Sequence, residues 1–263
     1  MKNDLLESVM EFLENLYPLS DAMTWDHVGL QIGDPKQKVQ KIITTLDVTP
    51  NLVDYAIKNN FDTIVSHHPL LFHPIQVLDL SDARNQMYQK IINHQINVYS
   101  MHTNFDVGKN GMNDWLAELI GLKNIEGICP VKTTSGTLLM GRMGDTTLEI
   151  EAIIEIFKHE LGLKMIKLLD NGKSFKKIGI LGGAGAEFIE PAFKSGVDLF
   201  ITGDVKYHDF LDAQIANYAV LDVGHVAEKI FARQMANLLQ ENFDFTIEAN
   251  TLDEMEIPGL ENK

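Results

Sequence analysis

The sequence predicts an α/β protein made of two similar lobes, each with a mixed sheet flanked by helices. Three observations lead to this fold class. Segments with the apolar spacing of strands alternate with segments of helical spacing along most of the chain. A local pattern recurs at a constant offset, as described below. The 263 residues, of which 45% are hydrophobic, are enough for one large domain or two modest ones.

The first half begins with helical spacing over 4–16, which Pro18 ends. Thr49 and Pro50 have the residue types of a helix N-cap and first helical position. The strands expected in this half are 28–33, 41–46, 63–65 and 96–101, and the further helices are 50–57, 84–94 and 112–120.

The second half repeats the alternation. Its expected strands are 137–142, 165–169, 177–181, 199–202 and 219–222, and its helices are 148–161, 186–194, 208–216 and 224–241. The acidic tail after Thr251 contains Pro258 and Gly259, so we expect it to be loosely held.

An internal echo links the two halves. Five residues of the first half recur in the same order 136 positions later. Lys41, Ile42, Ala56, Lys58 and Asp62 correspond to Lys177, Ile178, Ala192, Lys194 and Asp198. Any two β-α-β units look alike at this level, so the echo is compatible with a duplication without requiring one. We expect one two-lobed domain over 1–263, with lobe 1 at about 1–125 plus the C-terminal helix and lobe 2 at about 126–240.

Composition excludes several classes of function. The net charge of −15 disfavours nucleic-acid binding, since phosphate backbones repel an acidic surface and no basic patch is evident. The chain has one cysteine, Cys129, which cannot form an internal disulfide and fits a reducing, cytoplasmic setting. No segment resembles a signal peptide or has membrane-spanning length.

Three polar clusters follow expected strands. His67 and His68 come directly after the strand at 63–65, where Pro69 interrupts strand pairing and lets both rings face one cleft. Asp106 follows the strand at 96–101, with His102 beside it to orient ligands through hydrogen bonds. Taken alone, each cluster is equally compatible with ordinary loop residues.

The third cluster opens the last helix. His225 and Glu228 are three residues apart and share one helix face, and Gly224 permits a sharp turn into the helix. Ligand sites in α/β proteins form at the carboxyl ends of strands, so we expect the metal-binding cleft to lie between the lobes.

The metal ligands expected from these clusters are His67, His68, Asp106, His225 and Glu228. Mixed nitrogen and oxygen ligands favour zinc, manganese, iron or cobalt over calcium. Five protein ligands are too many for one catalytic ion with an open position. They are typical of two ions about 3.5–4 Å apart that share bridging carboxylates and a bridging water.

The sequence resembles the GTP cyclohydrolase 1 type 2 homologue family, whose members are also named after an Ngg-interacting factor. The resemblance spans nearly the whole chain. Its motifs are Trp25 to Gly33, Ser66 to Leu70, His102 to Asp106, Gly182 to Gly185, Thr202 to His208, and Gly224-His225 with Glu228.

This resemblance implies a two-lobed α/β fold, the same five metal ligands, and a homohexameric ring with metal sites facing a central cavity. The chain departs from the family pattern at two points. Some members separate the last histidine and glutamate by four residues, and some carry a large domain between the lobes, for which 127–176 is too short.

The resemblance and the ligand set together indicate a metal-dependent hydrolase of a nucleotide-like small molecule. His102 or His208 is then the proton-transfer group. The alternative is a non-catalytic metal-binding, metal-delivery or scaffold protein that forms a ring. The segment Gly182 to Gly185 has no P-loop lysine, so we interpret it as a tight turn rather than a phosphate cradle.

Overall fold

A computed structural model describes residues 4–251, and within them the chain forms two compact units. Unit 1 comprises 4–105 and 231–251, and unit 2 comprises 106–230. The first division therefore falls after Phe105 rather than near residue 125. The reason is that the helix at Met112–Leu119 packs on strands of unit 2.

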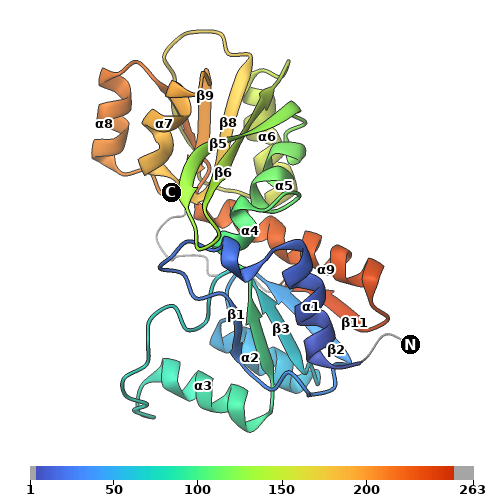
Figure 1. Cartoon of the computed structure of the whole chain (residues 1–263). Helices are drawn as coiled ribbons and strands as arrows, with labels where there is room; N and C mark the ends of the chain where they lie inside the picture. Colours follow the sequence, from blue (N-terminus) through green and yellow to red (C-terminus); the bar gives the residue numbers. More distant parts are fainter. Residues whose placement is uncertain (1–3, 252–263) are drawn as a thin grey trace. The chain divides into compact units, whose positions relative to one another are not determined.

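Unit 1 is built around a five-stranded mixed sheet in the order β1-β4-β3-β2-β11 (Figure 1). Its strands are β1 (Gly29–Ile32), β2 (Lys41–Thr45), β3 (Thr63–Ser66), β4 (Asn97–Ser100) and β11 (Thr246–Ala249). Its helices are α1 (Leu6–Leu16), η1 (Leu19–Asp21), α2 (Pro50–Lys58), α3 (Ala83–Asn93) and α9 (Ile230–Asn242), and α4 (Thr103–Val107) ends it. Strands β11, β2, β3 and β4 run parallel, whereas β1 is antiparallel to β4.

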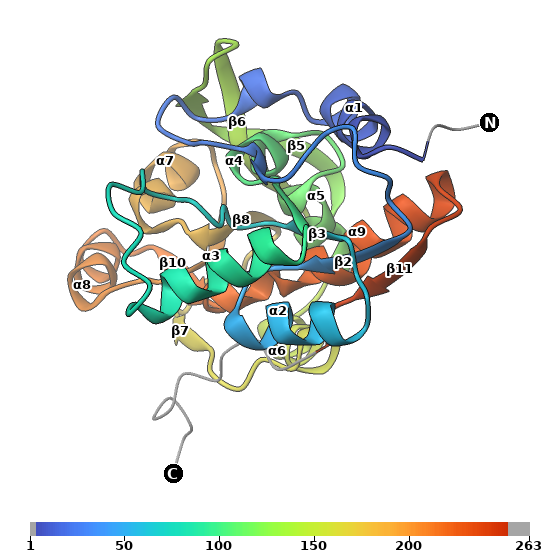
Figure 2. The same ribbon diagram turned by 90° about the horizontal axis from the view of Figure 1, so that it is seen from below.

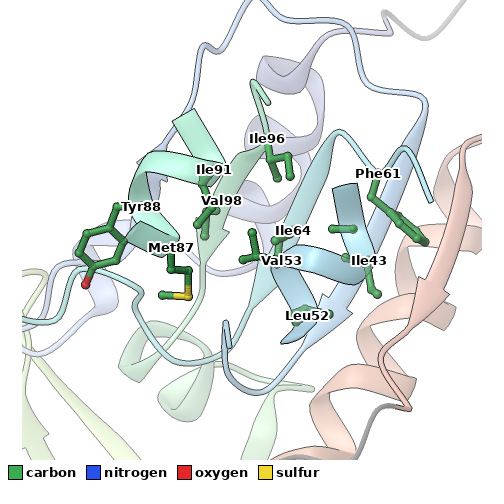
Figure 3. Packing of buried hydrophobic residues seen from close by; sticks show 11 residues of the cluster. Ile43, Leu52, Val53, Phe61, Ile64, Met87, Tyr88, Ile91, Ile96 and Val98 are labelled. Atoms are coloured by element: carbon green, nitrogen blue, oxygen red, sulfur yellow. The ribbon is translucent and has the colours of Figure 1, made fainter. Parts of the chain in front are cut away.

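The two faces of this sheet bury different helices. Ile43, Ile64 and Val98 are in register and pack against α2 and α3, as Figure 3 shows. On the opposite face, the Thr44 hydroxyl donates to the Ala232 carbonyl of α9 at 2.6 Å. Burial on both faces explains why β2, β3 and β4 consist of almost continuously buried residues.

Unit 2 contains a six-stranded mixed sheet in the order β5-β6-β8-β9-β10-β7. Its strands are β5 (Lys123–Lys132), β6 (Thr137–Asp145), β7 (Lys167–Leu169), β8 (Lys177–Ala184), β9 (Leu199–Gly203) and β10 (Ala219–Asp222). Its helices are α5 (Met112–Leu119), α6 (Ile150–Leu161), η2 (Ala186–Phe188), α7 (Ile189–Lys194), α8 (Tyr207–Ile215) and η3 (His225–Lys229). Strands β8, β9 and β10 form the parallel core of this sheet. Figure 2 shows the chain from below, with β8 and β10 labelled.

The sequence echo corresponds to shared local structure. In each unit the echoed segment opens a run of three parallel neighbours, β2-β3-β4 in one and β8-β9-β10 in the other. Asp62 Oδ2 accepts hydrogen bonds from the backbone N–H groups of Gln40 and Lys41. Asp198 Oδ2 accepts from those of Lys176 and Lys177 in the same way. The predicted α/β fold with two mixed sheets and flanking helices is therefore confirmed.

Several predicted elements were wrong or missed. β5 and β11 were not predicted, and the expected single helix at 224–241 is a 3₁₀ segment, η3, followed by α9. Gly182 to Ala184 continue β8 instead of forming the expected tight turn. The tail after Thr251 lies outside the described residues. Within 4–251, no helix is long and apolar enough to cross a membrane.

Candidate metal centre

Unit 1 places three histidines at the carboxyl ends of two neighbouring parallel strands. His67 and His68 follow β3 directly, and His102 lies two residues beyond β4. The ring centroids of His67 and His102 are 5.3 Å apart, and those of His68 and His102 are 5.6 Å apart. One ring nitrogen from each of the three lies within 4.8 Å of the other two. The expected site at these strand ends thus contains His102 in addition to the predicted pair.

Hydrogen bonds fix the tautomer of each of these histidines. His67 is fully buried and its Nδ1 lies 2.7 Å from the Met101 carbonyl oxygen. A carbonyl oxygen only accepts, so Nδ1 carries the hydrogen and Nε2 carries the lone pair. His68 Nδ1 is 2.8 Å from Asp47 Oδ1, and His102 Nδ1 is 3.0 Å from Asp26 Oδ2. In each ring Nε2 is therefore the nitrogen that could bind a metal ion.

Asp26, which accepts the hydrogen bond from His102, is itself held by further hydrogen bonds. Its side chain is almost fully buried, and Oδ2 also accepts from the backbone N–H and hydroxyl of Thr103, at 3.1 and 2.6 Å. Burial acts to raise the pKa of Asp26, but hydrogen bonds from His102 and Thr103 outweigh it and leave the pKa below its usual value. The carboxyl group is therefore ionised and holds the His102 Nδ1–H firmly.

Unit 2 uses the corresponding strand ends. Asp204 follows β9 and His225 follows the parallel strand β10, with Gly224 at φ 76° making the predicted sharp turn. His225 Nδ1 lies 2.8 Å from Asp204 Oδ2, so this ring holds Nδ1 on an oxygen atom as the three histidines of unit 1 do.

The three-residue spacing of His225 and Glu228 has a structural explanation. Both residues lie in η3, a 3₁₀ helix, in which side chains at i and i+3 are directly in line. His225 Nε2 is accordingly 3.2 Å from Glu228 Oε2. The four-residue spacing of an α-helix is not needed here, because the 3₁₀ turn already brings the two ligand atoms together.

Asp106 and Glu228 form a pair of buried carboxylates. Asp106 lies on α4, and one oxygen from each carboxyl group lies within 4.8 Å of the other. Two carboxylates this close repel each other when both are ionised, and burial strengthens the repulsion. A cation held by both oxygens would remove that cost.

Asn113 connects the backbone around these two carboxylates. Its Nδ2 donates to the Asp106 carbonyl at 3.2 Å, and its Oδ1 accepts from the Gly182 N–H at 2.8 Å. The next residue, Gly183, has φ 64°, and a Cβ atom there would lie 2.6 Å from Glu228 Oε1. The glycines at the end of β8 therefore make room for the Glu228 carboxyl group.

The donor atoms fit a transition-metal ion. All four histidines hold Nδ1 on an oxygen and present Nε2, the arrangement in which a second acceptor orients a metal-binding ring. Imidazole nitrogens with carboxylate oxygens suit zinc, manganese, iron and cobalt. The residues present thus fit the group that the sequence implied.

His208 lies apart from these ligands. It is exposed on the first turn of α8, where its ring contacts that of Tyr207 at 5.2 Å. Among the described residues, the ligand-capable groups do not include it.

The residues that orient the proposed ligands were not predicted. Asp47 and Asp204 each lie just past the end of a buried parallel strand, which is the signal that would have found them. Asp26 and Asn113 carry no such signal, because long-range contacts bring them to His102 and Gly182.

Comparison with known proteins identifies the family of this chain. The family model described as Duf34/NIF3 (NGG1p interacting factor 3) matches residues 5–256. The chain belongs to the Duf34/NIF3 family.

Relatives of this NIF3-family chain cover most of its length. The GTP cyclohydrolase 1 type 2 homolog of Clostridium perfringens is 34% identical over 84% of the chain and 85% of that protein. Among solved structures, Staphylococcus aureus protein SA1388 is 29% identical with a TM-score of 0.86, covering 96% of this chain and 98% of that one. A Bacillus cereus protein related to NIF3 shares the fold, with a TM-score of 0.88 at 24% identity, covering 97% and 99%.

Proposed function

We propose that this chain binds two divalent ions and is a metal-dependent hydrolase of a nucleotide-like small molecule. The observation that carries the proposal is the common orientation of four histidines, each with Nδ1 held by an oxygen atom, so that Nε2 is the nitrogen that the ring can offer to a metal ion. The proposed ligands are His67, His68, Asp106, His225 and Glu228.

The proposed ligands differ in kind between the two units. Unit 1 contributes neutral nitrogen donors, and unit 2 contributes two carboxylates and a histidine. Asp106 and Glu228 offset the charge of the cations, which neutral imidazoles cannot do. When bound, such ions polarise an attacked centre and lower the pKa of a coordinated water.

The remaining polar groups would bind and move protons. Asp26 holds the His102 Nδ1–H, so Nε2 of that ring is the atom that takes up or releases a proton. His208 is the second candidate for proton transfer, and its exposure on α8 leaves it open to exchange with solvent.

The substrate class comes from the relatives and from charge. The curated relatives are named GTP cyclohydrolase 1 type 2 homologs, which suggests a nucleotide-like molecule. The net charge of −15 argues against a polynucleotide.

Elemental analysis and a turnover assay test this proposal together. Protein purified without chelators should contain about two equivalents of zinc, manganese, iron or cobalt per chain. It should hydrolyse at least one member of a nucleotide panel, lose that activity on chelation, and regain it when one of these metals is restored. A reproducible value near one equivalent with metal in excess would contradict the two-ion site.

His102→Ala separates the two roles open to that residue. Retention of both ions with a large fall in turnover indicates proton transfer, whereas loss of one ion indicates a ligand. Full metal occupancy without turnover across the panel would instead support the metal-binding or metal-delivery alternative.

A further inference from the structure

Two half-exposed aromatic side chains lie next to the histidine cluster of unit 1. Trp25 precedes β1 and is 50% exposed, and Phe72 lies on the loop after β3 and is 46% exposed. Their ring centroids are 5.8 Å apart at an interplanar angle of 60°. The centroid of His102 is 6.0 Å from that of Trp25 and 6.3 Å from that of Phe72. The three rings thus contact one another edge to face beside the proposed ligands.

Both aromatic residues are attached to well-anchored segments. Trp25 is bonded to Asp26, whose carboxylate is held by His102 and Thr103. Phe72 follows Leu71, whose N–H donates to Gln31 Oε1 of β1 at 3.2 Å. The two rings are therefore held in place before any ligand arrives, which reduces the entropy lost on binding.

Leaving so much aromatic surface in water forgoes a large gain from burial. A planar ring that stacks on either face would recover it, and stacking tolerates many ring types because each has a π-face. Because both aromatic rings contact the His102 ring, a ring stacked on either of them would lie near that histidine. A net charge of −15 also disfavours the binding of phosphate groups by themselves, so an uncharged ring supplies binding free energy that the phosphates do not.

We propose that Trp25 and Phe72 form a stacking site for a planar heteroaromatic ring of the substrate. The site would place the substituents of that ring beside the His67, His68 and His102 cluster. This inference rests on the proposed function, because it takes the occupant to be the small-molecule substrate of the metal centre.

The test compares two ligands that differ only in the ring. Guanosine 5′-monophosphate and ribose 5-phosphate are titrated into metal-loaded Trp115→Phe protein, in which Trp25 is the one remaining tryptophan. We expect the nucleotide to quench Trp25 fluorescence saturably and to bind at least about ten-fold more tightly than the sugar phosphate.

Variants locate the site. Phe72→Leu should weaken nucleotide binding by roughly five- to hundred-fold, the range that base–aromatic stacking supports, without changing ribose 5-phosphate binding. Phe72→Tyr keeps the ring and should keep the affinity. Val77→Ala, an exposed apolar residue of the same loop, is the matched control and should have no effect.

Three outcomes would overturn the stacking site. The first is equal affinity of the protein for the two ligands, and the second is unchanged nucleotide affinity in Phe72→Leu. The third is a Trp25 signal that follows protein concentration rather than ligand, which would mean that a second copy covers the rings. Metal content is measured on the same samples. If the protein binds no metal, the proposed function is wrong. The comparison of the two ligands still tests whether Trp25 and Phe72 form a stacking site.

Discussion

At the scale of single residues, the six side chains within 4–251 that could hold a metal ion are not equivalent. A carboxylate can hold two cations through its two oxygens, and its charge offsets the repulsion between them. A neutral imidazole serves one ion and offsets nothing. This difference leads to unequal effects of substitution at the proposed centre.

Asp106→Asn should remove most of both metals, whereas His67→Ala or His68→Ala should weaken mainly one. Calorimetric metal titration measures the effect, and circular dichroism should show a folded chain, because these ligands follow strand ends or lie in short helices. Asp212→Asn removes the same charge from an exposed position of α8 and serves as the control. Two ions bound by Asp106→Asn with unchanged affinity would show that the bridging ligand is wrongly assigned.

Asp26 permits a test of orientation without direct metal contact. Asp26→Ala removes the acceptor for His102 Nδ1–H and Thr103, so we expect metal affinity or turnover to fall by about ten- to hundred-fold. Asp26→Asn keeps an acceptor oxygen and should fall only a few-fold. The ¹⁵N shifts of the His102 ring report the tautomer directly. If the His102 tautomer is unchanged in Asp26→Ala, Asp26 does not orient that ring.

At the scale of elements, β8 and η3 together place the Glu228 carboxyl group. Gly183 has a left-handed backbone conformation, and a Cβ atom there would meet Glu228 Oε1. This close approach is possible because β8 continues through glycines to Ala184.

Gly183→Ala should therefore displace Glu228 and weaken metal binding. It also carries the backbone cost of a left-handed alanine, about 1 kcal/mol. Gly121→Ala is a matched control, because Gly121 has φ 69° with nothing within 4 Å of its Cβ position. Chemical denaturation should show similar losses of stability in both variants, with a loss of metal affinity in Gly183→Ala alone. Equal metal affinity of Gly183→Ala and Gly121→Ala would show that Gly183 has no role in metal binding.

The same elements show how far the sequence could predict this structure. Strands β3, β4, β9 and β10 were predicted closely, because buried strands are continuous apolar runs that end at recognisable polar residues. That is why His67, His68, Asp106, His225 and Glu228 could be selected as candidates. β5 was missed because most of its residues outside 128–131 are polar and exposed or half-buried. β11 was missed because its partner, β2, is about 200 residues away in the sequence.

Long-range contacts also explain what was missed at the site. The hydrogen bonds of Asp26 with His102 and of Asn113 with Gly182 join residues whose separation along the chain no local pattern reports. The 3₁₀ form of η3 was hidden as well, since His225 to Lys229 fit an α-helical pattern equally well.

At the scale of the whole molecule, metal binding should stabilise the chain by mass action. Cys129 can report this, because it is buried on β5 of unit 2 and burial raises its thiol pKa to about 11. Reagents for thiolates should therefore react only after unit 2 opens. Saturating metal should slow labelling strongly, and Asp106→Asn should abolish that protection. Labelling that is fast in the native protein and insensitive to metal would contradict the link between unit 2 and the ions.

We propose, from the family resemblance, that the chain assembles as a homohexamer. One surface of unit 2 is a candidate for the interface between copies. Tyr207, Leu211 and Ile215 recur every four residues along α8, so they form one apolar stripe. Tyr207 and Ile215 are 75% and 76% exposed, which is unusual for such large side chains lined up on one helix.

Light scattering should give the mass of six 29.5 kDa chains, about 177 kDa. If the stripe lies between copies, Ile215→Glu buries an unpaired charge there and should shift the protein to a smaller species. Ala216→Glu adds the same charge one residue later, away from the stripe, and should leave the mass unchanged. A stable monomer of the unsubstituted chain at micromolar concentration would remove the ring altogether. A hexamer that survives Ile215→Glu would keep the ring but place its interfaces elsewhere, because a carboxylate without a partner is not tolerated in the dry centre of an interface.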